Sequence, residues 1–142
     1  MPNIAVFGGT GYLASIIKNQ NNVKKNKFVF FSRKQKSKNY INYNSLRKSS
    51  NNFKKFDFIV NLLGPSQNQL KKNEELIKKK NKIISDICDL CLKNNIKLIH
   101  ISSMHVYKSY GIKSISLNSK INNKKLYSKS HYDSEKIIQR KF

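Results

Sequence analysis

The sequence predicts an α/β fold with a doubly wound parallel sheet, and three observations lead to it. Short apolar, β-prone runs recur along the chain and alternate with longer stretches of helical periodicity. The first run, Ile4 to Phe7, leads into a glycine-rich turn and then into an amphipathic stretch. Strands that alternate with helices through short turns form parallel sheets. We therefore expect one domain over residues 1–142.

The composition is that of an ordinary globular domain. The chain has 142 residues, 38% of them hydrophobic, which is enough for one core. No apolar run approaches the ~20 residues of a membrane span, and the first strand follows directly on Met1, Pro2 and Asn3. We expect no membrane partner, no signal peptide and a cytoplasmic location.

The formal net charge of +22 raises the question of a nucleic-acid partner. The excess is almost all lysine, which rises together with asparagine and isoleucine along the whole chain. Nucleic-acid surfaces usually combine arginine with aromatic residues on one face. The lysine content is better explained as compositional drift, so we expect no specific nucleic-acid partner. A basic nucleic-acid binder remains the outlying alternative.

The turn after the first strand carries the strongest motif. Gly8, Gly11 and Ala14 are spaced by three between a predicted strand and a predicted helix. This is the context of a Rossmann dinucleotide-binding motif. Gly8 permits a sharp turn, Gly11 permits close approach of a pyrophosphate, and Ala14 keeps the helix near the sheet. The alternative is a glycine-rich turn that binds nothing.

The second predicted strand, Phe28 to Phe31, bears on the choice of cofactor. An NAD site places an Asp or Glu about 20 residues past the glycines, but the chain has no acidic residue before Asp57. Arg33, just after the strand, could instead meet a 2′-phosphate. The sequence therefore favours NADP(H) over NAD(H). The alternative is that Arg33 is a solvated loop residue.

Further elements follow from apolar pattern and from turn residues. A third strand is expected over 40–43, then a short helix over 45–56 capped by Asn44 or Ser45, a fourth strand from Phe58 ending at Gly64-Pro65, and a fifth strand over 96–101. Residues 68–95 show helical periodicity, with one apolar face made of Leu70, Ile77, Ile84, Ile87, Cys88, Cys91 and Leu92. The two cysteines are predicted to be core residues, and no metal site is expected.

Two late segments suggest acid–base chemistry. The fifth strand leads into Ser102 and Ser103, and Tyr132 and Lys136 follow four residues apart. Residues four apart share a helix face, and a nearby ammonium favours the anionic form of a tyrosine. Such a tyrosine can exchange a proton with a hydroxyl group. In a chain so rich in lysine, this spacing can also arise by chance.

The order of these motifs resembles the extended short-chain dehydrogenase/reductase family, which contains nucleotide-sugar epimerases, dehydratases and reductases. The matching segments are Gly8-Gly9-Thr10-Gly11-Tyr12-Leu13-Ala14, Asn61-Leu62-Leu63-Gly64, Ser103 and the Tyr132/Lys136 pair. The resemblance implies an NAD(P)-dependent epimerase or reductase acting on a nucleotide sugar, in surface polysaccharide synthesis. Sugar dehydration is disfavoured, because Met104 and His105 stand where the dehydratases carry Asp-Glu.

The resemblance also implies roles for individual residues. Ser103, Tyr132 and Lys136 would be catalytic, with Ser102 a less favoured choice of serine. Asn81 would support the active site. The residues implied to bind the cofactor are Gly8, Thr10, Gly11, Tyr12, Leu13, Arg33, Leu62, Leu63, Gly64, Tyr132 and Lys136.

The extent of the resemblance leaves a second hypothesis open. Family members continue well beyond the position of Phe142, so we expect the C-terminal substrate lobe to be missing. The alternative function is therefore a non-catalytic dinucleotide-binding module or an inactive fragment. Family members often dimerise through the helices that match residues 68–95 and the Tyr132 helix, which implies a possible homodimer.

Overall fold

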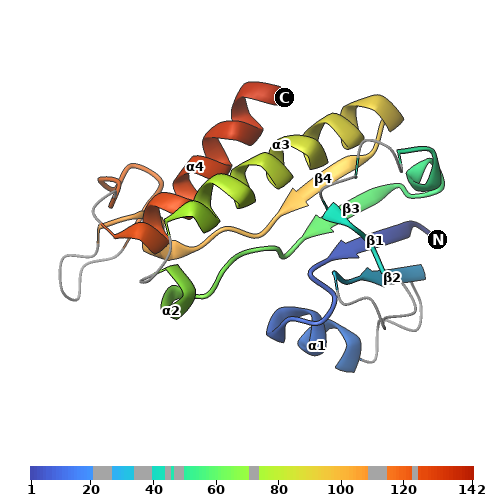
Figure 1. Cartoon of the computed structure of the whole chain (residues 1–142), viewed down its shortest axis with the longest axis horizontal. Helices are drawn as coiled ribbons and strands as arrows, with labels where there is room; N and C mark the ends of the chain where they lie inside the picture. Colours follow the sequence, from blue (N-terminus) through green and yellow to red (C-terminus); the bar gives the residue numbers. More distant parts are fainter. Residues whose placement is uncertain are drawn as a thin grey trace. The chain divides into compact units, whose positions relative to one another are not determined.

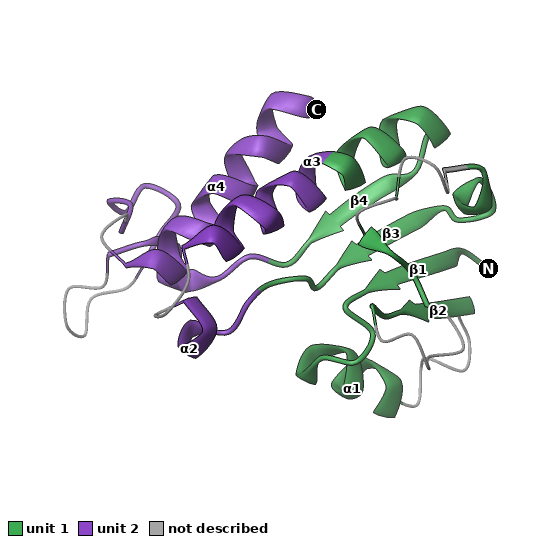
Figure 2. Ribbon diagram, viewed as in Figure 1, with its two compact units in different colours: residues 1–64, 86–101 green, residues 65–85, 102–142 purple. Residues whose placement is uncertain are grey.

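The computed structural model describes residues 1–20, 27–33, 40–43, 46, 50–70, 74–108, 115–122 and 125–142. They divide into two compact units (Figure 2). Unit 1 contains residues 1–64 and 86–101, and unit 2 contains residues 65–85 and 102–142. One long helix, α3 (Glu75–Asn94), contributes its first part to unit 2 and its last part to unit 1.

Unit 1 is built on a parallel sheet. Its described residues form four strands in the spatial order β2-β1-β3-β4 (Figure 1). Val6 pairs with Phe30 on one side and with Val60 on the other, so β1 is central. The strands are β1 (Asn3–Phe7), β2 (Lys27–Phe31), β3 (Phe58–Asn61) and β4 (Lys97–His100). The predicted parallel sheet is confirmed.

The sheet is doubly wound, also as predicted. The chain leaves β1 through α1 (Tyr12–Asn19) and reaches β2 at one edge. It then returns to β3 on the other side of β1 and reaches β4 through α3. Right-handed crossovers in opposite directions place α1 and the unit 1 part of α3 on opposite faces. The strand order reverses beside β1, where such sheets hold their ligands.

Aromatic side chains fill the core of unit 1 beneath the end of β1. The Phe7 ring is fully buried, and its centroid lies 5.7 Å from that of Phe31 and 5.6 Å from those of Tyr43 and Phe53. Offset and edge-to-face pairs of this kind add about 0.5–1.5 kcal/mol each beyond the area that they bury. This cluster fixes the end of the strand that leads into the glycine turn.

The predicted third strand, residues 40–43, is wrong. Tyr40 forms a single parallel bridge with Ser32, and the Ile41 N–H donates to the Ser32 carbonyl over 2.9 Å. The described residues 41–43 form no further pair with the sheet, and Ile41 and Tyr43 are buried in the core, where they are 6% and 5% exposed. Ile41 and Tyr43 are buried and Asn42 is exposed, so the alternation of a strand is present, but the ladder of sheet hydrogen bonds is not formed by the described residues 41–43.

The helix predicted over 45–56 is also corrected. Its described part contains a 3-10 turn, η3 (Ser50–Phe53). Asn44 and Ser45, the predicted caps, lie outside the described residues. Phe53 and Phe56, 2% and 4% exposed, join the aromatic core, so packing decides this segment more than helical propensity does.

The helix predicted over 68–95 appears as α2 (Gln67–Leu70) and α3. Asn95, with a positive φ of 53°, ends α3, and the Ile96 N–H bonds the Cys91 carbonyl over 2.9 Å. The predicted apolar face is confirmed except at Leu92, which is 50% exposed, because it lies on the outer side of the last turn. Cys88 and Cys91 are fully buried free thiols, as predicted for core residues.

Unit 2 is organised around α4 (Leu126–Lys141), which lies alongside the first part of α3 (Figure 2). A 3-10 turn, η4 (Met104–Val106), packs against α4. The buried side chains of α4 are all polar, namely Ser128, Ser130, His131 and Ser134. Among the described helices of the whole chain, none has both the length and the apolar character needed to cross a membrane.

Candidate functional site

The glycine turn after β1 has the shape that its sequence predicts. Gly8 adopts a positive φ of 89°, which side chains rarely tolerate. A Cβ there would also lie 3.2 Å from the carbonyl carbon of Leu62. The Leu62 N–H donates to the Phe7 carbonyl over 3.0 Å. Gly8 therefore allows both the sharp turn and the close approach of the segment that follows β3.

Gly9 is a structural requirement that the three-residue spacing misses. A Cβ on Gly9 would lie 2.8 Å from the Phe30 Cβ, closer than real side chains approach. Its N–H donates to the Phe31 carbonyl over 2.8 Å. Gly9 thus fastens the turn onto the end of β2. The sequence did offer a signal for Gly9, because the sharp turn requires only Gly8. A second, adjacent glycine therefore suggests a close contact of its own.

The amino end of α1 is open to an anion. Gly11 is the N-cap residue, in an extended conformation, and no side chain caps the helix. Its own N–H donates to the Gly8 carbonyl over 2.9 Å, which closes the turn. The N–H groups of Tyr12 and Leu13 begin the helix, where backbone donors and the helix dipole favour negative charge. Ala14 is fully buried, as close packing on the sheet requires. This cradle suits a pyrophosphate.

Tyr43 supports the glycine turn through its hydroxyl group, a role that sequence reasoning missed. Its hydroxyl accepts the Gly8 N–H over 3.1 Å and donates to the Phe31 carbonyl over 3.4 Å. Burial raises the pKa of Tyr43 to about 12, although the Gly8 hydrogen bond and the charge of Arg33 act in the opposite direction. The hydroxyl therefore stays protonated and keeps both bonds. A tyrosine placed in a predicted strand gave no signal for this role.

The residues at the end of β2 lie beside the same turn. The Thr10 and Ser32 hydroxyl oxygens are 3.4 Å apart. Arg33 is exposed and close enough to Tyr43 for its charge to affect that hydroxyl. The structure thus brings Arg33 to the neighbourhood of the glycine turn.

The segment after β3 is held by Asn61, which is 1% exposed. Its Oδ1 accepts the Leu63 N–H over 3.1 Å, and its Nδ2 lies 2.9 Å from His100 Nδ1. His100 is therefore hydrogen-bonded to a neighbouring strand within the sheet. Together with the Leu62–Phe7 bond, Asn61 fixes the path of Leu62 and Leu63 at the carboxyl edge of the sheet.

In unit 2, the two serines after β4 have different partners. The Ser103 hydroxyl lies 3.1 Å from His105 Nδ1 and accepts the His105 N–H over 3.3 Å, which caps η4. The Ser102 hydroxyl donates to the Glu135 carboxylate on α4. Among the described residues of unit 2, the Ser103 hydroxyl thus hydrogen-bonds to His105 and makes no hydrogen bond to Tyr132. The His105 ring also packs edge-on against Tyr127, with centroids 5.7 Å apart.

Tyr132 and Lys136 lie on the same face of α4, as their spacing predicts. The Lys136 ammonium is 4.7 Å from the centroid of the Tyr132 ring, a cation–π arrangement. Tyr132 is half-buried and Lys136 is exposed. The two side chains are therefore in contact, with the Lys136 ammonium over the face of the Tyr132 ring.

Lys80 is a buried charged residue that sequence reasoning missed. It is 5% exposed, and its ammonium donates to the Ser130 carbonyl and to the Ser130 hydroxyl, both over 3.1 Å. Burial lowers the pKa of Lys80 to about 8, although Asp133 and Glu135 act to raise it. The helical period offered a signal of this burial, because position 80 falls three residues after Ile77 and four before Ile84, on the apolar face of the helix. Nearby Asn81, the predicted support of the active site, has a buried Oδ1 that makes no hydrogen bond among the described residues.

A comparison with protein families decides the assignment. The model of the NAD dependent epimerase/dehydratase family matches residues 4–141, nearly the whole chain. The chain belongs to this family. A comparison with curated proteins gave no significant match.

Solved structures of epimerases, dehydratases and reductases share the fold of this epimerase/dehydratase-family chain. UDP-N-acetylglucosamine 4-epimerase from Bacillus cereus is 20% identical, with a TM-score of 0.81 over 99% of this chain and 50% of its own. The dTDP-glucose 4,6-dehydratase from Bacillus anthracis, solved with NAD, is 19% identical, with a TM-score of 0.79 over 99% and 50%. The dTDP-4-dehydrorhamnose reductase from Bacillus anthracis, solved with NADP, is 13% identical, with a TM-score of 0.81 over 98% and 49%. The chain thus spans about half the length of these structures.

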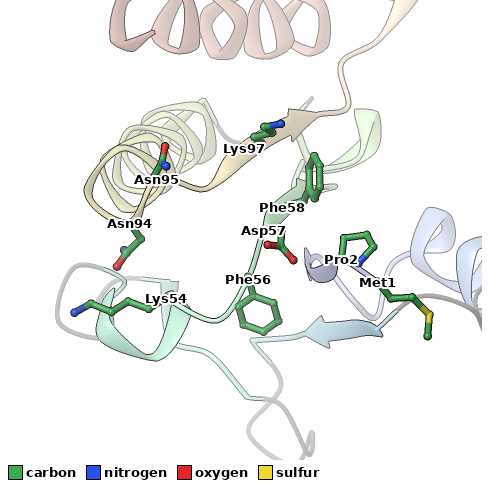
Figure 3. Close-up of a pocket in the computed structure, with 9 residues that line it drawn as sticks. All are labelled: Met1, Pro2, Lys54, Phe56, Asp57, Phe58, Asn94, Asn95 and Lys97. Carbon is green, nitrogen blue, oxygen red and sulfur yellow. The ribbon is translucent and has the colours of Figure 1, made fainter.

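A pocket in unit 1 of this family member lies away from the glycine turn. Figure 3 shows it at the starts of β1, β3 and β4, where Pro2, Phe58 and Lys97 line it. In a parallel sheet this is the edge opposite the glycine turn. Asp57, also in the lining, accepts the Asn3 N–H over 2.7 Å, so its carboxylate helps to close the end of the sheet. The pocket is therefore separate from the dinucleotide cradle.

Proposed function

We propose that this chain is the dinucleotide-binding part of a nicotinamide-dependent nucleotide-sugar epimerase or reductase. The observation that carries the proposal is the glycine turn. Its Gly9 fits tightly onto β2, and its α1 begins without a side-chain cap. Backbone N–H groups at such a helix start are the donors that bind a pyrophosphate. Membership of the epimerase/dehydratase family supports the same assignment.

Several residues of unit 1 would bind the cofactor. Backbone donors around Gly11 would hold the pyrophosphate, while Leu62 and Leu63, fixed by Asn61, would line the segment after β3. Arg33 would favour NADP(H), because its positive charge can meet a 2′-phosphate. No acidic residue stands at this strand end to bind the ribose hydroxyls of NAD(H). The proposed cofactor-binding set is Gly8, Thr10, Gly11, Tyr12, Leu13, Arg33, Leu62, Leu63, Gly64, Tyr132 and Lys136.

Residues of unit 2 would supply acid–base chemistry. A bound nicotinamide dinucleotide supplies hydride transfer at a sugar carbon. Tyr132 would exchange a proton with the sugar hydroxyl at that carbon, and Lys136, which stacks on its ring, would provide the positive charge. Ser103 would orient the same oxygen, which requires its hydroxyl to leave His105.

The reaction class rests on the family and on two residues. Met104 and His105 offer no carboxylate after Ser103, which favours epimerase or reductase chemistry over dehydration. By analogy with the family, the substrate would be a UDP- or dTDP-sugar used in surface polysaccharide synthesis in the cytoplasm. A homodimer through α3 and α4 stays a prediction.

A second function, a dinucleotide-binding module without catalysis, is favoured by one contact. The Ser103 hydroxyl is engaged with His105, which leaves Tyr132 without its predicted hydroxyl partner. The two functions differ in turnover, not in cofactor binding.

The test is turnover of UDP-glucose, UDP-N-acetylglucosamine and dTDP-4-dehydrorhamnose by the purified chain with NAD(H) and NADP(H). If the chain is an enzyme, it should form epimerised or reduced product. The Tyr132→Phe variant should form none, while it still binds the cofactor. Tyr127→Phe, on the same helix without a lysine four residues later, is the matched control. Cofactor binding without any turnover would favour the non-catalytic module.

A further inference from the structure

A buried ammonium joins the two helices of unit 2. Lys80 lies on the part of α3 that belongs to this unit, and α4 lies alongside it (Figure 2). The Lys80 ammonium donates to the Ser130 carbonyl and to the Ser130 hydroxyl, each over 3.1 Å. Lys80 is 5% exposed and Ser130 is fully buried. Two of the three ammonium protons are therefore used on a single residue of α4.

The stability of the protein does not require a charge at this position. Position 80 lies on the same helix face as Ile77 and Ile84, both buried, so an apolar side chain would continue the pattern. Replacing buried ionic groups by apolar side chains of similar volume is often neutral or stabilising. Where such groups are retained, they can fix one arrangement of the elements around them. The place of Ser130 on α4 indicates which arrangement Lys80 would fix.

Ser130 lies in the part of α4 that presents Tyr132, two residues further on. Its carbonyl accepts the Ser134 hydroxyl over 3.0 Å in addition to the ammonium from α3. Glu135, three residues after Tyr132, accepts the hydroxyl of Ser102 in the segment after β4. Helix α4 is thus held on both sides of Tyr132, by α3 on one side and by the segment after β4 on the other.

The charges around Lys80 make its bonds depend on pH. Burial lowers the pKa of Lys80 to about 8, although the carboxylates of Asp133 and Glu135, both on α4, act in the other direction. An exposed ion pair, from Lys129 to Glu74 over 3.4 Å, also joins these segments and contributes little to stability. Hydrogen bonds from an ammonium are about twice as strong as those from a neutral donor. The bonds to Ser130 should therefore weaken when Lys80 loses its proton.

We propose that Lys80 is a positioning residue for Tyr132: its ammonium holds α4 where Tyr132 can meet the cofactor and the sugar hydroxyl. The inference rests on the proposed function, because Tyr132 is the proposed proton-transfer residue. Lys80 acts through Ser130 and needs no contact with substrate or cofactor. Loss of its proton loosens the part of α4 that bears Tyr132, so proton transfer becomes less efficient.

The first measurement separates positioning from stability. Turnover of UDP-glucose, UDP-N-acetylglucosamine and dTDP-4-dehydrorhamnose and urea unfolding are followed at pH 7, 8 and 9. We expect kcat of the unmodified chain to fall over this range. Lys80→Met should lower kcat at pH 7 by about 10–100-fold, as misplacement of a reacting group does, and remove the fall. Its stability at pH 7 should not decrease, whereas a residue with only a structural role would lower stability and activity together.

A double-mutant cycle tests the route through Ser130. Ser130→Ala removes one of the two acceptors of the Lys80 ammonium, so it should lower kcat by less than Lys80→Met does. Combined with Lys80→Met, it should cause no further loss, because residues that act through one contact are not additive. Full additivity of the two losses in kcat would overturn the inference.

The second measurement needs no turnover. Tyrosine labelled with ¹³C at Cζ reports on each ring by NMR, and the Tyr132 signal is identified by its loss in Tyr132→Phe. We expect this signal to shift with a midpoint at the pKa of Lys80, about 8, and the step to be absent in Lys80→Met. Lys78→Met is the matched control, because Lys78 is exposed on the same helix. It should retain both the step and kcat.

Two results for Lys80→Met would overturn the inference, namely an unchanged kcat or a Tyr132 signal that keeps its step. A Tyr132 signal without a step near pH 8 in the unmodified chain would overturn it too. Absence of turnover in the unmodified chain and in every variant would instead refute the proposed enzyme. The Tyr132 signal would then decide the role of Lys80 alone.

Discussion

The ammonium of Lys80 on α3 donates two hydrogen bonds to Ser130 on α4, each 3.1 Å long, inside unit 2. Ser130 stands two residues before Tyr132, and the Ser134 hydroxyl donates to the same Ser130 carbonyl over 3.0 Å. A buried lysine therefore fixes the part of α4 from which the proposed acid–base tyrosine projects. Burial of this lysine lowers its pKa, which makes its contribution to stability depend on pH.

The first prediction concerns Lys80→Met. The pKa of Lys80 is about 8 in the folded protein, below its ordinary value of 10.5. Between these values the unfolded chain binds more protons, so the free energy of unfolding rises with pH, by about 3 kcal/mol in all from this residue. Denaturant unfolding at pH 7, 8, 9 and 10 should show this rise lost in Lys80→Met.

Lys78→Met is the control for the loss of one lysine, because Lys78 is exposed on the same helix. It should keep the pH dependence of the unmodified protein. At pH 7, Lys80→Met should be at least as stable as the unmodified protein, since an apolar side chain replaces a buried charge. A Lys80→Met variant with an unchanged pH dependence would show that this lysine is not buried in solution.

The second prediction concerns the hydroxyl of Tyr43. Tyr43→Phe removes the acceptor of the Gly8 N–H and leaves that donor without its partner. We expect a loss of about 1–2 kcal/mol in the free energy of unfolding and weaker binding of both NADH and NADPH. Thermal denaturation and fluorescence titration measure the two effects. Tyr40→Phe, on a tyrosine that is 42% exposed, should change neither.

The third prediction compares two glycines of the turn. Gly9→Ala would place a Cβ 2.8 Å from the Phe30 Cβ, whereas Gly11→Ala would place one 3.3 Å from the Gly8 carbonyl oxygen. Overpacking of this kind costs about 1–3 kcal/mol, so Gly9→Ala should be the less stable variant. Urea unfolding of both variants decides the order. The reverse order would mean that the turn does not pack on β2 as described.

The fourth prediction concerns the contact between Ser102 and Glu135. Glu135→Ala removes the acceptor that ties the segment after β4 to α4. Amide hydrogen exchange at residues 102–106 should become faster, because this segment then opens at a lower cost. Asp133→Ala, two residues away on α4, is the control and should leave the exchange unchanged. If the amides of residues 102–106 exchanged at the same rate in Glu135→Ala as in Asp133→Ala, the contact between Ser102 and Glu135 would not hold this segment.

Much of the fold follows from the sequence because local pattern and packing agree there. The run Ile4 to Phe7 and the run from Phe58 are apolar enough to lie inside a sheet, and both became strands. The segment 40–43 also contains β-prone residues, but its Tyr43 packs on Phe7 and bonds Gly8 instead. Such a choice depends on contacts far apart in the chain, which the residue pattern does not contain.

Some residues of the candidate site were likewise predictable from the sequence, and others were not. Gly8, Gly11 and Ala14 were predictable, since each needs a small residue for a local reason. Lys80 was missed although it falls in the helical period of Ile77 and Ile84, because in a chain with 29 lysines and arginines a lysine at such a position is expected to be solvated. Its contact to Ser130 comes from the folded chain alone.

The most direct measurement of the central claim is titration of the folded chain with NADPH and NADH, followed by nicotinamide fluorescence, beside the Gly11→Val variant. The claim predicts saturable binding of at least one dinucleotide by the unmodified chain. It also predicts loss of that binding in Gly11→Val, because the added side chain blocks the approach of the pyrophosphate to α1. The circular dichroism of the variant should remain that of the folded chain. Binding of neither dinucleotide, or equal binding by Gly11→Val, would contradict the claim.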